Sequence, residues 1–306
     1  MEDFSSNKRR LSAVLKQYTQ YLNLEKSFSK NTLDAYICDL DKLIGYAEVE
    51  NLSLFDIKLS HLQNFVAGLH DLGIHPRSQA RIISGIKSFY QYLQLENVVE
   101  INPAELLESP KIGFKVPEVL TLEEVDSIIN SVDVSTDEGQ RNRAILETLY
   151  SCGLRVSELT DLKISNLYFE EEFIIVEGKG SKQRLVPISN RAIQEIRYYL
   201  MARSQQVVKR GQEDVLFLNR RGSGLSRVMI FNIVKRYLAK TKIKKNVSPH
   251  TFRHSFATHL LEGGANLRAI QSMLGHESIV TTEIYTHIDR NLIRHELLTY
   301  HPRNNK

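Results

Sequence analysis

The sequence predicts a mainly α-helical protein with one small β-sheet, divided into two domains. Apolar residues recur at helical spacing through most of the 306 residues. A proline-containing stretch near residue 110 interrupts this pattern, and one pair of β-rich segments flanks a Gly-Lys-Gly-Ser turn near residue 179. The chain is also longer than a typical single hydrophobic core, which favours two domains.

The first hundred residues predict four amphipathic helices joined by short links, and so a compact helical bundle. Their apolar residues fall in four stretches, at 11–22, 33–44, 62–72 and 82–93. Ser29 and Asn31 are candidate N-caps of the second helix, and Gly73 ends the third. We expect residues 1–107 to form this N-terminal domain.

A linker and a second domain follow. The helical pattern breaks between Asn102 and Pro117, where prolines and Gly113 predict an extended linker that we place at 108–118. We expect residues 119–306 to form a mixed α/β domain. Its predicted elements are a helix capped by Thr121 and Glu124, a helix around 139–152, a helix start near Val156, a hairpin of 173–176 with 184–188, and a helix from Ser248 to Gly263–Gly264.

The composition excludes several classes of protein. Hydrophobic residues make up 42% of the chain and charged residues 25%, which is ordinary for a soluble globular protein. No run approaches the ~20 apolar residues needed to cross a bilayer. Because Met1–Arg10 is polar, we expect no secretory signal and no membrane contact. Cys38 and Cys152 are too few for a disulfide framework, so we expect buried thiols in a reducing cytoplasm.

His250 and Arg253 lie three residues apart on one predicted helix and so share a face. Pro249 places His250 in the first turn, where backbone N–H groups and the helix dipole favour an anion. His250 and His254 also have the four-residue spacing of a zinc-binding helix. Thr251 replaces the glutamate of such a helix, and Arg253 would put positive charge beside the metal. We therefore predict no metal site and expect His254 to pack or bond locally.

Arg155 follows a turn that leads into a helix. By itself such an arginine is more often a surface residue, but its planar fork can bind two phosphate oxygens at once. Together with Arg253 it would neutralise the charge that develops on a pentavalent phosphorane. Glu158, one turn later, is either solvated or orients these cations. Lys179 at the hairpin tip is either a solvated turn residue or a proton donor to a departing 5′ oxygen.

His276 and Tyr285 complete the set. Tyr285 is one of 13 tyrosines, and a lone tyrosine in an apolar frame is normally a core residue. A free phenol has a pKa of ~10, so a nucleophilic Tyr285 needs positive charge and a base, which His250 or His276 would supply. A tyrosine that displaces an alcohol from a phosphodiester conserves the bond energy in a phosphotyrosine link. The set therefore predicts cutting and resealing of DNA without ATP.

The candidate catalytic residues lie in local sequence motifs that together indicate a family. The motifs read GLRVSEL, GKGSKQRLVPIS, SPHTFRHSFATHLL and LGHESIVTTEIYTH, with LEKSFSKNTLDAY near the start, ESPK in the linker and HPR at the end. Over nearly its whole length the chain resembles the tyrosine site-specific recombinases. It is most similar to the Xer-type chromosome dimer resolvases, and nearer to their XerD branch than to XerC. Phe252 stands where relatives often carry leucine, which we expect to alter packing only.

The resemblance implies roles for the residues that match the family's motifs. The catalytic set would be Arg155, Lys179, His250, Arg253, His276 and the nucleophile Tyr285, supported by the acidic Glu158. An N-terminal helical core-binding domain would clamp DNA, and a tyrosine-recombinase catalytic domain would cut it. Strand exchange would pass through a 3′-phosphotyrosine intermediate and a Holliday junction, with no metal, nucleotide or other cofactor.

The resemblance also implies partners. The substrate would be a double-stranded DNA recombination site, bound by a tetramer that includes a second Xer-type recombinase. Chromosome dimers would be resolved at cell division, under a possible septal DNA translocase. The segment that carries Leu292, Ile293, Leu297 and Leu298 would dock on a neighbouring subunit, and an ordinary intramolecular helix is its alternative.

Further DNA contacts are sought among the basic residues. Residues 1–115 hold 13 Lys and Arg against 14 Asp and Glu, whereas residues 116–306 hold 27 against 22. A modest basic excess in the second domain fits a nucleic-acid partner. Gln79 and Ser84 are candidates to reach phosphates or base edges beside the basic residues of the fourth helix. The basic candidates are Arg77, Arg81, Lys87, Arg220, Arg221, Arg227, Lys235 and Arg236. An ordinary solvent-exposed surface would explain the basic residues of the fourth helix, and those between 220 and 236, equally well.

Three alternatives stay open at this point. The chain could be the integrase of a phage or mobile element, or a DNA-binding relative that has lost catalysis. The intact six-residue set argues against lost catalysis. A metal-dependent nuclease would need a carboxylate cluster, which the sequence lacks. The target DNA sequence, the partner recombinase and the order of strand exchange do not follow from the sequence.

Overall fold

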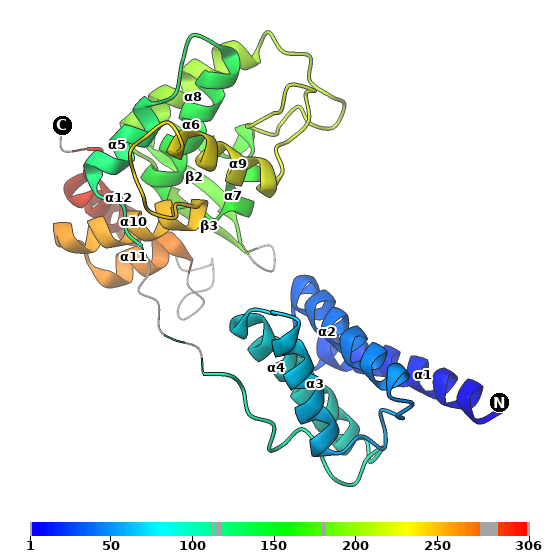
Figure 1. Ribbon diagram of the computed structural model, residues 1–306. Helices are drawn as coiled ribbons and strands as arrows, with labels where there is room; N and C mark the ends of the chain where they lie inside the picture. Colours follow the sequence, from blue (N-terminus) through cyan, green and yellow to red (C-terminus); the bar gives the residue numbers. More distant parts are fainter. Residues whose placement is uncertain (1, 112, 114–117, 179–181, 276–286, 305–306) are drawn as a thin grey trace. The chain divides into compact units, whose positions relative to one another are not determined.

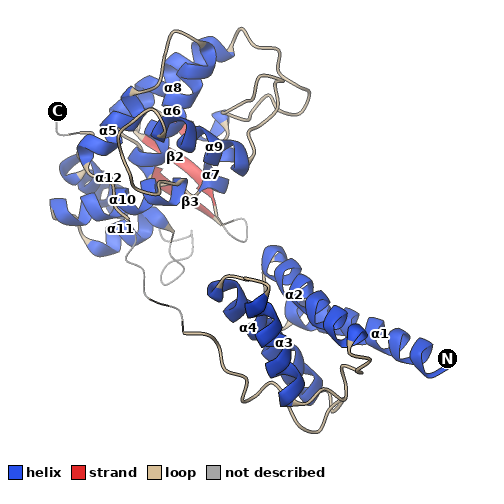
Figure 2. Cartoon of the chain, in the orientation of Figure 1, coloured by secondary structure: helices blue, strands red, loops and turns tan. Residues whose placement is uncertain are grey.

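The computed structural model describes residues 2–111, 113, 118–178, 182–275 and 287–304. The chain divides into two compact units, residues 1–115 and 116–306 (Figure 1). No helix within the described ranges is both long and apolar enough to cross a membrane. Figure 2 shows that the first unit is helical and that the second combines helices with one small sheet, which confirms the predicted fold class.

The N-terminal unit is the predicted bundle of four helices. Their bounds are α1 Glu2–Leu24, α2 Lys30–Val49, α3 Leu59–Asp71 and α4 Pro76–Leu95. The predicted cap of α2 is confirmed, since Ser29 Oγ accepts a hydrogen bond from Thr32 N. The apolar face of α4 is fully buried, and the Tyr90 hydroxyl donates to the Leu54 carbonyl at 2.9 Å. That bond satisfies a buried hydroxyl in an otherwise apolar core.

The segment after α4 packs on the bundle. Ala104 and Leu107 are buried in its core, and both lie inside the N-terminal domain predicted for residues 1–107. The chain there is irregular yet packed, because Asn102 Oδ1 accepts the Ala104 N–H and satisfies the turn locally. Cys38 is exposed rather than buried, since it lies on the outer face of α2, whereas Cys152 in the second unit is buried as expected.

The C-terminal unit contains a three-stranded antiparallel sheet and the remaining helices. The strands are β1 Leu167–Tyr168, β2 Phe173–Glu177 and β3 Gln183–Pro187, in the order β1-β2-β3. In the β2–β3 hairpin Ile174 pairs with Val186 and Val176 with Arg184. The hairpin was predicted, but two-residue β1 was not, because so short a strand carries no periodicity.

Helices cover this sheet and build the main core. Their bounds are α5 Leu122–Asn130, α6 Asp137–Cys152, α7 Val156–Thr160, α8 Asn190–Arg203 and α9 Arg227–Leu238, with a 3₁₀ turn η1 at Ile164–Asn166. The Thr121–Glu124 capping box of α5 is confirmed. Helix α6 is buried on all sides from Ala144 to Cys152, including its polar residues Glu147 and Ser151, which bond to each other.

Three further helices pack together in this unit. They are α10 Pro249–Gly263, α11 Leu267–Leu274 and α12 His287–Tyr300. Phe256 of α10, Met273 of α11 and Leu297 of α12 share one apolar cluster. In the single chain, the described part of α12 is therefore an intramolecular helix. Docking on a neighbouring subunit would involve a second copy and stays a prediction.

Candidate active site

The turn after α6 positions the first candidate arginine. Gly153 has a φ of 58°, the left-handed region that glycine adopts without strain. A Cβ at this position would lie 2.4 Å from Cδ1 of Phe256, so the backbone must approach that ring closely. The chain then turns at once, and Arg155 becomes the N-cap residue of α7.

Arg155 and Glu158 are joined within one helical turn. The backbone N–H of Arg155 donates to Oε2 of Glu158 at 2.8 Å, and its Nη1 donates to Oε1 at 2.8 Å. Only 2% of the Glu158 side chain is exposed, against 38% of that of Arg155. Of the two alternatives for Glu158, the structure therefore shows the orienting one. The exposed part of Arg155 is left facing solvent, where an anion can reach it.

Arg184 on β3 is a member of this cluster that sequence reasoning missed. Its Nη1 and Nη2 donate to Oε1 and Oε2 of Glu158 at 2.7 and 2.8 Å, and only 8% of its side chain is exposed. A signal was present in the sequence. In β3, Arg184 and Val186 alternate on the buried face, and a charged residue on such a face needs an ionic partner.

Arg253 reaches the same carboxylate from α10. Its Nη1 lies 3.7 Å from Oε2 of Glu158 and donates to the Gly153 carbonyl at 2.8 Å. Its Nη2 donates to the Leu274 carbonyl. Glu158 thus gathers three guanidinium groups from α7, β3 and α10. These four residues carry two positive charges in excess, which suits a phosphodiester anion.

The charges in the cluster shift one another's pKa values. Burial alone would raise the pKa of Glu158, but hydrogen bonds and charge from Arg184, together with the hydrogen bonds from Arg155, outweigh it and lower the pKa to about 2. Burial, then repulsion from Arg155, lowers the pKa of Arg253 to about 10, while Glu158 opposes that fall. Glu158 and Arg253 are therefore both ionised at neutral pH, and the carboxylate keeps the arginines together.

The C-terminal end of α11 is bound by the same three arginines. Three successive carbonyls at this end accept one hydrogen bond each: Met273 from Arg184 Nε at 2.9 Å, Leu274 from Arg253 Nη2, and Gly275 from Arg155 Nη2 at 3.0 Å. Carbonyls at a helix C-terminus lack intrahelical donors and carry partial negative charge, so cations are favourable there. The contacts fix the end of α11 immediately before His276 in the chain.

The remaining catalytic candidates divide into two groups. His250 is in the first turn of α10, as predicted, and its side chain is exposed. Lys179, His276 and Tyr285 lie outside the described residues. His254 is exposed, so of the two expected alternatives, packing in the core is wrong and a local bond stays a prediction. Among the described residues, no group of three His, Cys, Asp or Glu side chains is placed to hold a metal ion.

The candidate DNA-contacting residues of α4 differ in exposure and in the intramolecular partners that they bind. Arg77 is exposed. Arg81 is ion-paired with Asp39, whose side chain is fully buried, so it has a structural role in joining α4 to α2. Lys87 donates to the Glu105 carbonyl. Gln79 is buried and donates to the Ile74 carbonyl, so the expectation that it reaches DNA is wrong.

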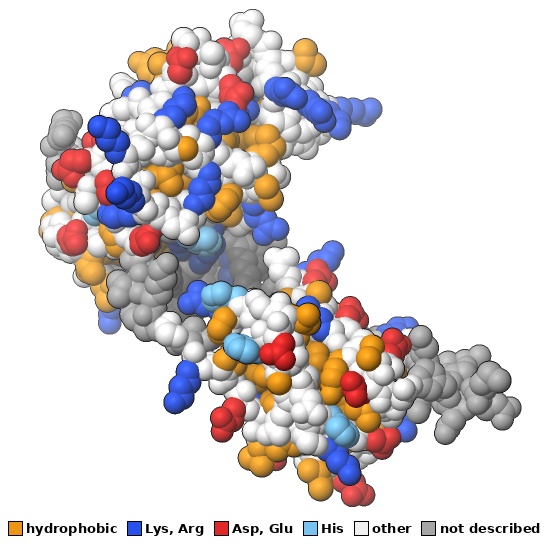
Figure 3. All heavy atoms as spheres, in the orientation of Figure 1, with side chains coloured by type: hydrophobic (Ala, Val, Ile, Leu, Met, Phe, Trp, Pro, Cys, Tyr) orange, Lys and Arg blue, Asp and Glu red, His pale blue; other side chains and the backbone are white. Residues whose placement is uncertain are grey.

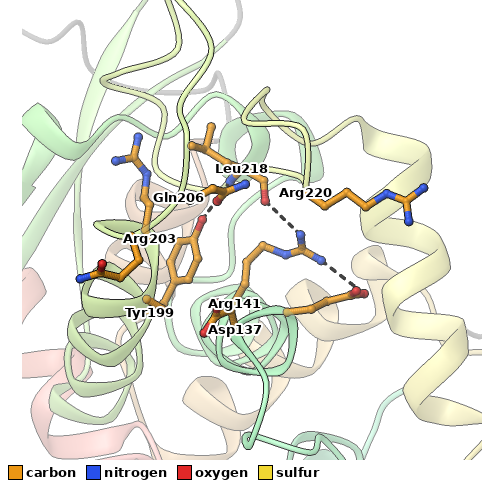
Figure 4. A pocket seen from close by; sticks show the side chains of 10 residues that line it. Asp137, Arg141, Tyr199, Arg203, Gln206, Leu218 and Arg220 are labelled. Carbon is orange, nitrogen blue, oxygen red and sulfur yellow. Dashed lines mark hydrogen bonds and ion pairs between the residues drawn. The ribbon is translucent and has the colours of Figure 1, made fainter.

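The second basic group lies around α9. Arg221 and Arg227 are exposed, whereas Arg236 pairs with Glu138 at 2.8 Å and Lys235 donates to Asn246. Arg220 lines a pocket of about 250 Å³, and Figure 4 shows its side chain extending outward. This pocket shares no lining residue with the arginine cluster around Glu158. On the face drawn in Figure 3, described acidic, basic and apolar side chains are interspersed over both units.

Comparisons with known proteins bear on the whole chain. Residues 118–291 match the model of the phage integrase family, and residues 15–97 match the N-terminal SAM-like domain of phage integrases. A protein named tyrosine recombinase XerD from Chlorobaculum tepidum is 42% identical over 293 residues, covering 95% of this chain and 96% of its own. Another of that name, from Staphylococcus epidermidis, is 40% identical over 294 residues, covering 96% and 100%.

Solved structures show the same architecture. The crystal structure of the XerH site-specific recombinase bound to its difH substrate, in a pre-cleavage complex, has a TM-score of 0.68 and 25% identity, over 86% of this chain and 79% of that one. A lambda integrase dimer bound to a core site has a TM-score of 0.68 over 88% of this chain and 95% of that one. At 19% identity this likeness concerns the fold alone.

The chain thus belongs to the phage integrase family, and the relatives named above are tyrosine recombinases. Within that family it is a Xer-type enzyme, a DNA strand transferase that carries out site-specific recombination. This confirms the resemblance drawn from the motifs.

Proposed function

We propose that Tyr285 is the nucleophile and that Arg155 and Arg253 bind the phosphodiester it attacks. The observation that carries the proposal is that Glu158 holds these two arginines at one place, with Arg155 partly exposed. The phenolate oxygen forms a bond to phosphorus, the bond to the 5′ oxygen breaks, and Lys179 gives that oxygen a proton. The reverse steps reseal the strand, so no metal or nucleotide is consumed.

The two histidines complete the proposed site. His250 stands in the first turn of α10, where the helix dipole favours an anion, and it is three residues from Arg253. His276 directly follows Gly275, whose carbonyl Arg155 holds. In this proposal one of the two accepts the phenol proton. The other donates a hydrogen bond to a non-bridging phosphate oxygen.

The biological role is proposed from the relatives. XerH in the solved complex is bound to its difH substrate, and lambda integrase is seen as a dimer on a core site. We propose that this chain binds a duplex recombination site in the cytoplasm, as a tetramer with a second Xer-type recombinase. It would resolve chromosome dimers at cell division, and a septal translocase would control it.

The proposed division of labour follows the chain. Residues 1–107 would clamp DNA, 108–118 would link the domains, and 119–306 would perform catalysis. Arg77, Arg220, Arg221 and Arg227 are exposed and suited to phosphate contacts. The other basic candidates would contact DNA in addition to the intramolecular partner that each has: Arg81, Lys87, Lys235 and Arg236. For Arg81, loss of the Asp39 pair would destabilise the bundle as well as weaken DNA binding.

The experiment asks whether a covalent adduct forms through Tyr285. The purified chain is incubated with genomic DNA fragments from the organism that carries the gene, and the DNA ends trapped on protein are sequenced. We expect a discrete cleavage site. Tyr285→Phe should bind the same DNA with unchanged affinity and form no adduct. Tyr198→Phe is the matched control, because Tyr198 is an exposed tyrosine of α8, and it should form the adduct normally. An adduct with Tyr285→Phe would refute the assignment.

A further inference from the structure

Arg184 has a different place in the site from the other two arginines. It is nearly buried, whereas Arg155 is 38% exposed, so it is poorly placed to touch a DNA phosphate. Its guanidinium donates to both carboxylate oxygens of Glu158, whereas the guanidinium of Arg155 donates to Oε1 alone. Its Nε donates to Met273, so one side chain ties β3 to both α7 and the end of α11.

The backbone around Arg184 is shaped to admit it. Gly275 ends α11 with a φ of 64°, and a Cβ there would lie 3.0 to 3.1 Å from Nη1, Cδ and Cζ of Arg184. Such contacts are tighter than normal packing, so a side chain at 275 would force the guanidinium to shift. The carbonyl of the same glycine accepts the Arg155 bond. Arg184 therefore packs against the peptide that orients Arg155.

We propose that Arg184 is a positioning residue of the strand-transfer site. It holds Glu158 and the end of α11 in the geometry that aims Arg155 at the phosphate, and it does not contact DNA itself. The inference rests on the proposed phosphate-binding role of Arg155 and Arg253.

Arg184 can position Arg155 because both side chains bond the carboxylate of Glu158. Both oxygens of Glu158 are fixed by Arg184, and the same oxygens accept the Nη1 and backbone bonds of Arg155. Without Arg184 the carboxylate would keep only the two bonds from Arg155, and it would turn toward Arg253, whose Nη1 now lies 3.7 Å from Oε2. Arg155 would lose its fixed orientation. A displacement of about 1 Å in a catalytic group can slow a reaction by about 100-fold.

The test compares three variants in single-turnover cleavage. The substrate is a synthetic duplex with the cleavage sequence recovered from trapped adducts, nicked so that cleavage releases a short fragment irreversibly. At saturating protein, Arg184→Met should slow adduct formation about 10- to 100-fold, with less than a threefold change in DNA affinity. Arg184→Lys keeps the charge but cannot bond both oxygens and Met273 together, so it should recover only part of the rate.

Arg141→Met is the matched control. Arg141 is a buried arginine of α6 in the same unit, and Figure 4 shows its bond to the Leu218 carbonyl. Its hydrogen-bond and ion-pair partners, Leu218, Asn142 and Glu138, do not belong to the Glu158 cluster. Its loss should lower the melting temperature while the cleavage rate of the folded protein stays within threefold of normal. An equal loss of rate in both variants would mean that Arg184 only supports the fold, and would overturn the proposal.

A double-mutant cycle separates positioning from an independent effect. If Arg184 acts through Arg155, then Arg184→Lys should cost little more once Arg155→Lys is present. Rate losses that multiply would overturn the proposal, as would an unchanged rate in Arg184→Met. Wild-type protein that forms no adduct at all would instead refute the proposed function. The two failures are therefore distinguishable.

Discussion

Replacing Glu158 with glutamine tests the electrostatic basis of the site. Gln keeps the shape of the side chain but removes the charge that three arginines share, and its amide N–H groups would face guanidinium donors. The chain is expected to fold, because the hydrophobic core of the C-terminal unit is large. Its stability at neutral pH should fall, and the size of that fall follows from the pKa of Glu158.

The magnitude is about 3 kcal/mol. A carboxyl whose pKa falls from 4.5 to about 2 on folding stabilises the folded state by about 1.4 kcal/mol per pKa unit at neutral pH. The side chain is only 2% exposed, so solvent screening reduces this little. Removing one partner of a buried ion pair costs about 3–5 kcal/mol by a separate rule, and the two figures agree.

The sign of the pH dependence follows from the depressed pKa. The stabilisation is complete above the unfolded pKa of Glu158 and is lost as pH falls toward its folded value. Protonated Glu and Gln are alike in shape and charge, so the difference between wild type and Glu158→Gln should shrink below about pH 5. At pH 3 it should be about two fifths of its value at pH 7.

Urea unfolding of the full chain at pH 7 and pH 3, followed by circular dichroism, measures this difference. Hydrogen exchange of α6 peptides at neutral pH assigns the transition to the C-terminal unit. Glu138→Gln is the control, since Glu138 pairs with Arg236 but is half exposed, and it should change stability by less than about 1 kcal/mol. A loss with Glu158→Gln that stays equal at both pH values would refute the electrostatic account.

Two other predictions concern the same unit. Gly153→Ala should destabilise by about 2–4 kcal/mol in thermal unfolding, because it adds a left-handed alanine and a clash with Phe256. Gly73→Ala, at a φ of 70° in open space, should cost only about 1–2 kcal/mol, and equal costs would contradict the clash. Burial, then the charge of Arg303, lowers the pKa of His301 to about 3, so stability should fall as pH drops below 6.5. His301→Asn, which keeps an acceptor for the Arg303 N–H, should lose about 1–2 kcal/mol less than wild type between pH 7 and pH 5 in urea unfolding. If wild type and His301→Asn lost the same stability between pH 7 and pH 5, this account of His301 would be contradicted.

Local signals explain why much of the fold was predictable. The four helices of the N-terminal unit, the Thr121 capping box and the β2–β3 hairpin each depend on residues within a few positions of one another. Helical spacing, caps and turns act over that range, so the sequence displays them directly. The burial of Ala104 was missed, because it depends on packing against a distant part of the bundle.

The sequence by itself determined the family and the residue types of the chemistry: two arginines, a lysine, two histidines and a tyrosine in recognisable frames. Only the tertiary structure decided that Glu158 is the shared centre of the cluster and that Arg184 belongs to it. The reason is physical. A buried carboxylate is stable only where cations from separate elements converge on it, and convergence of α7, β3 and α10 is set by packing across more than ninety residues of chain.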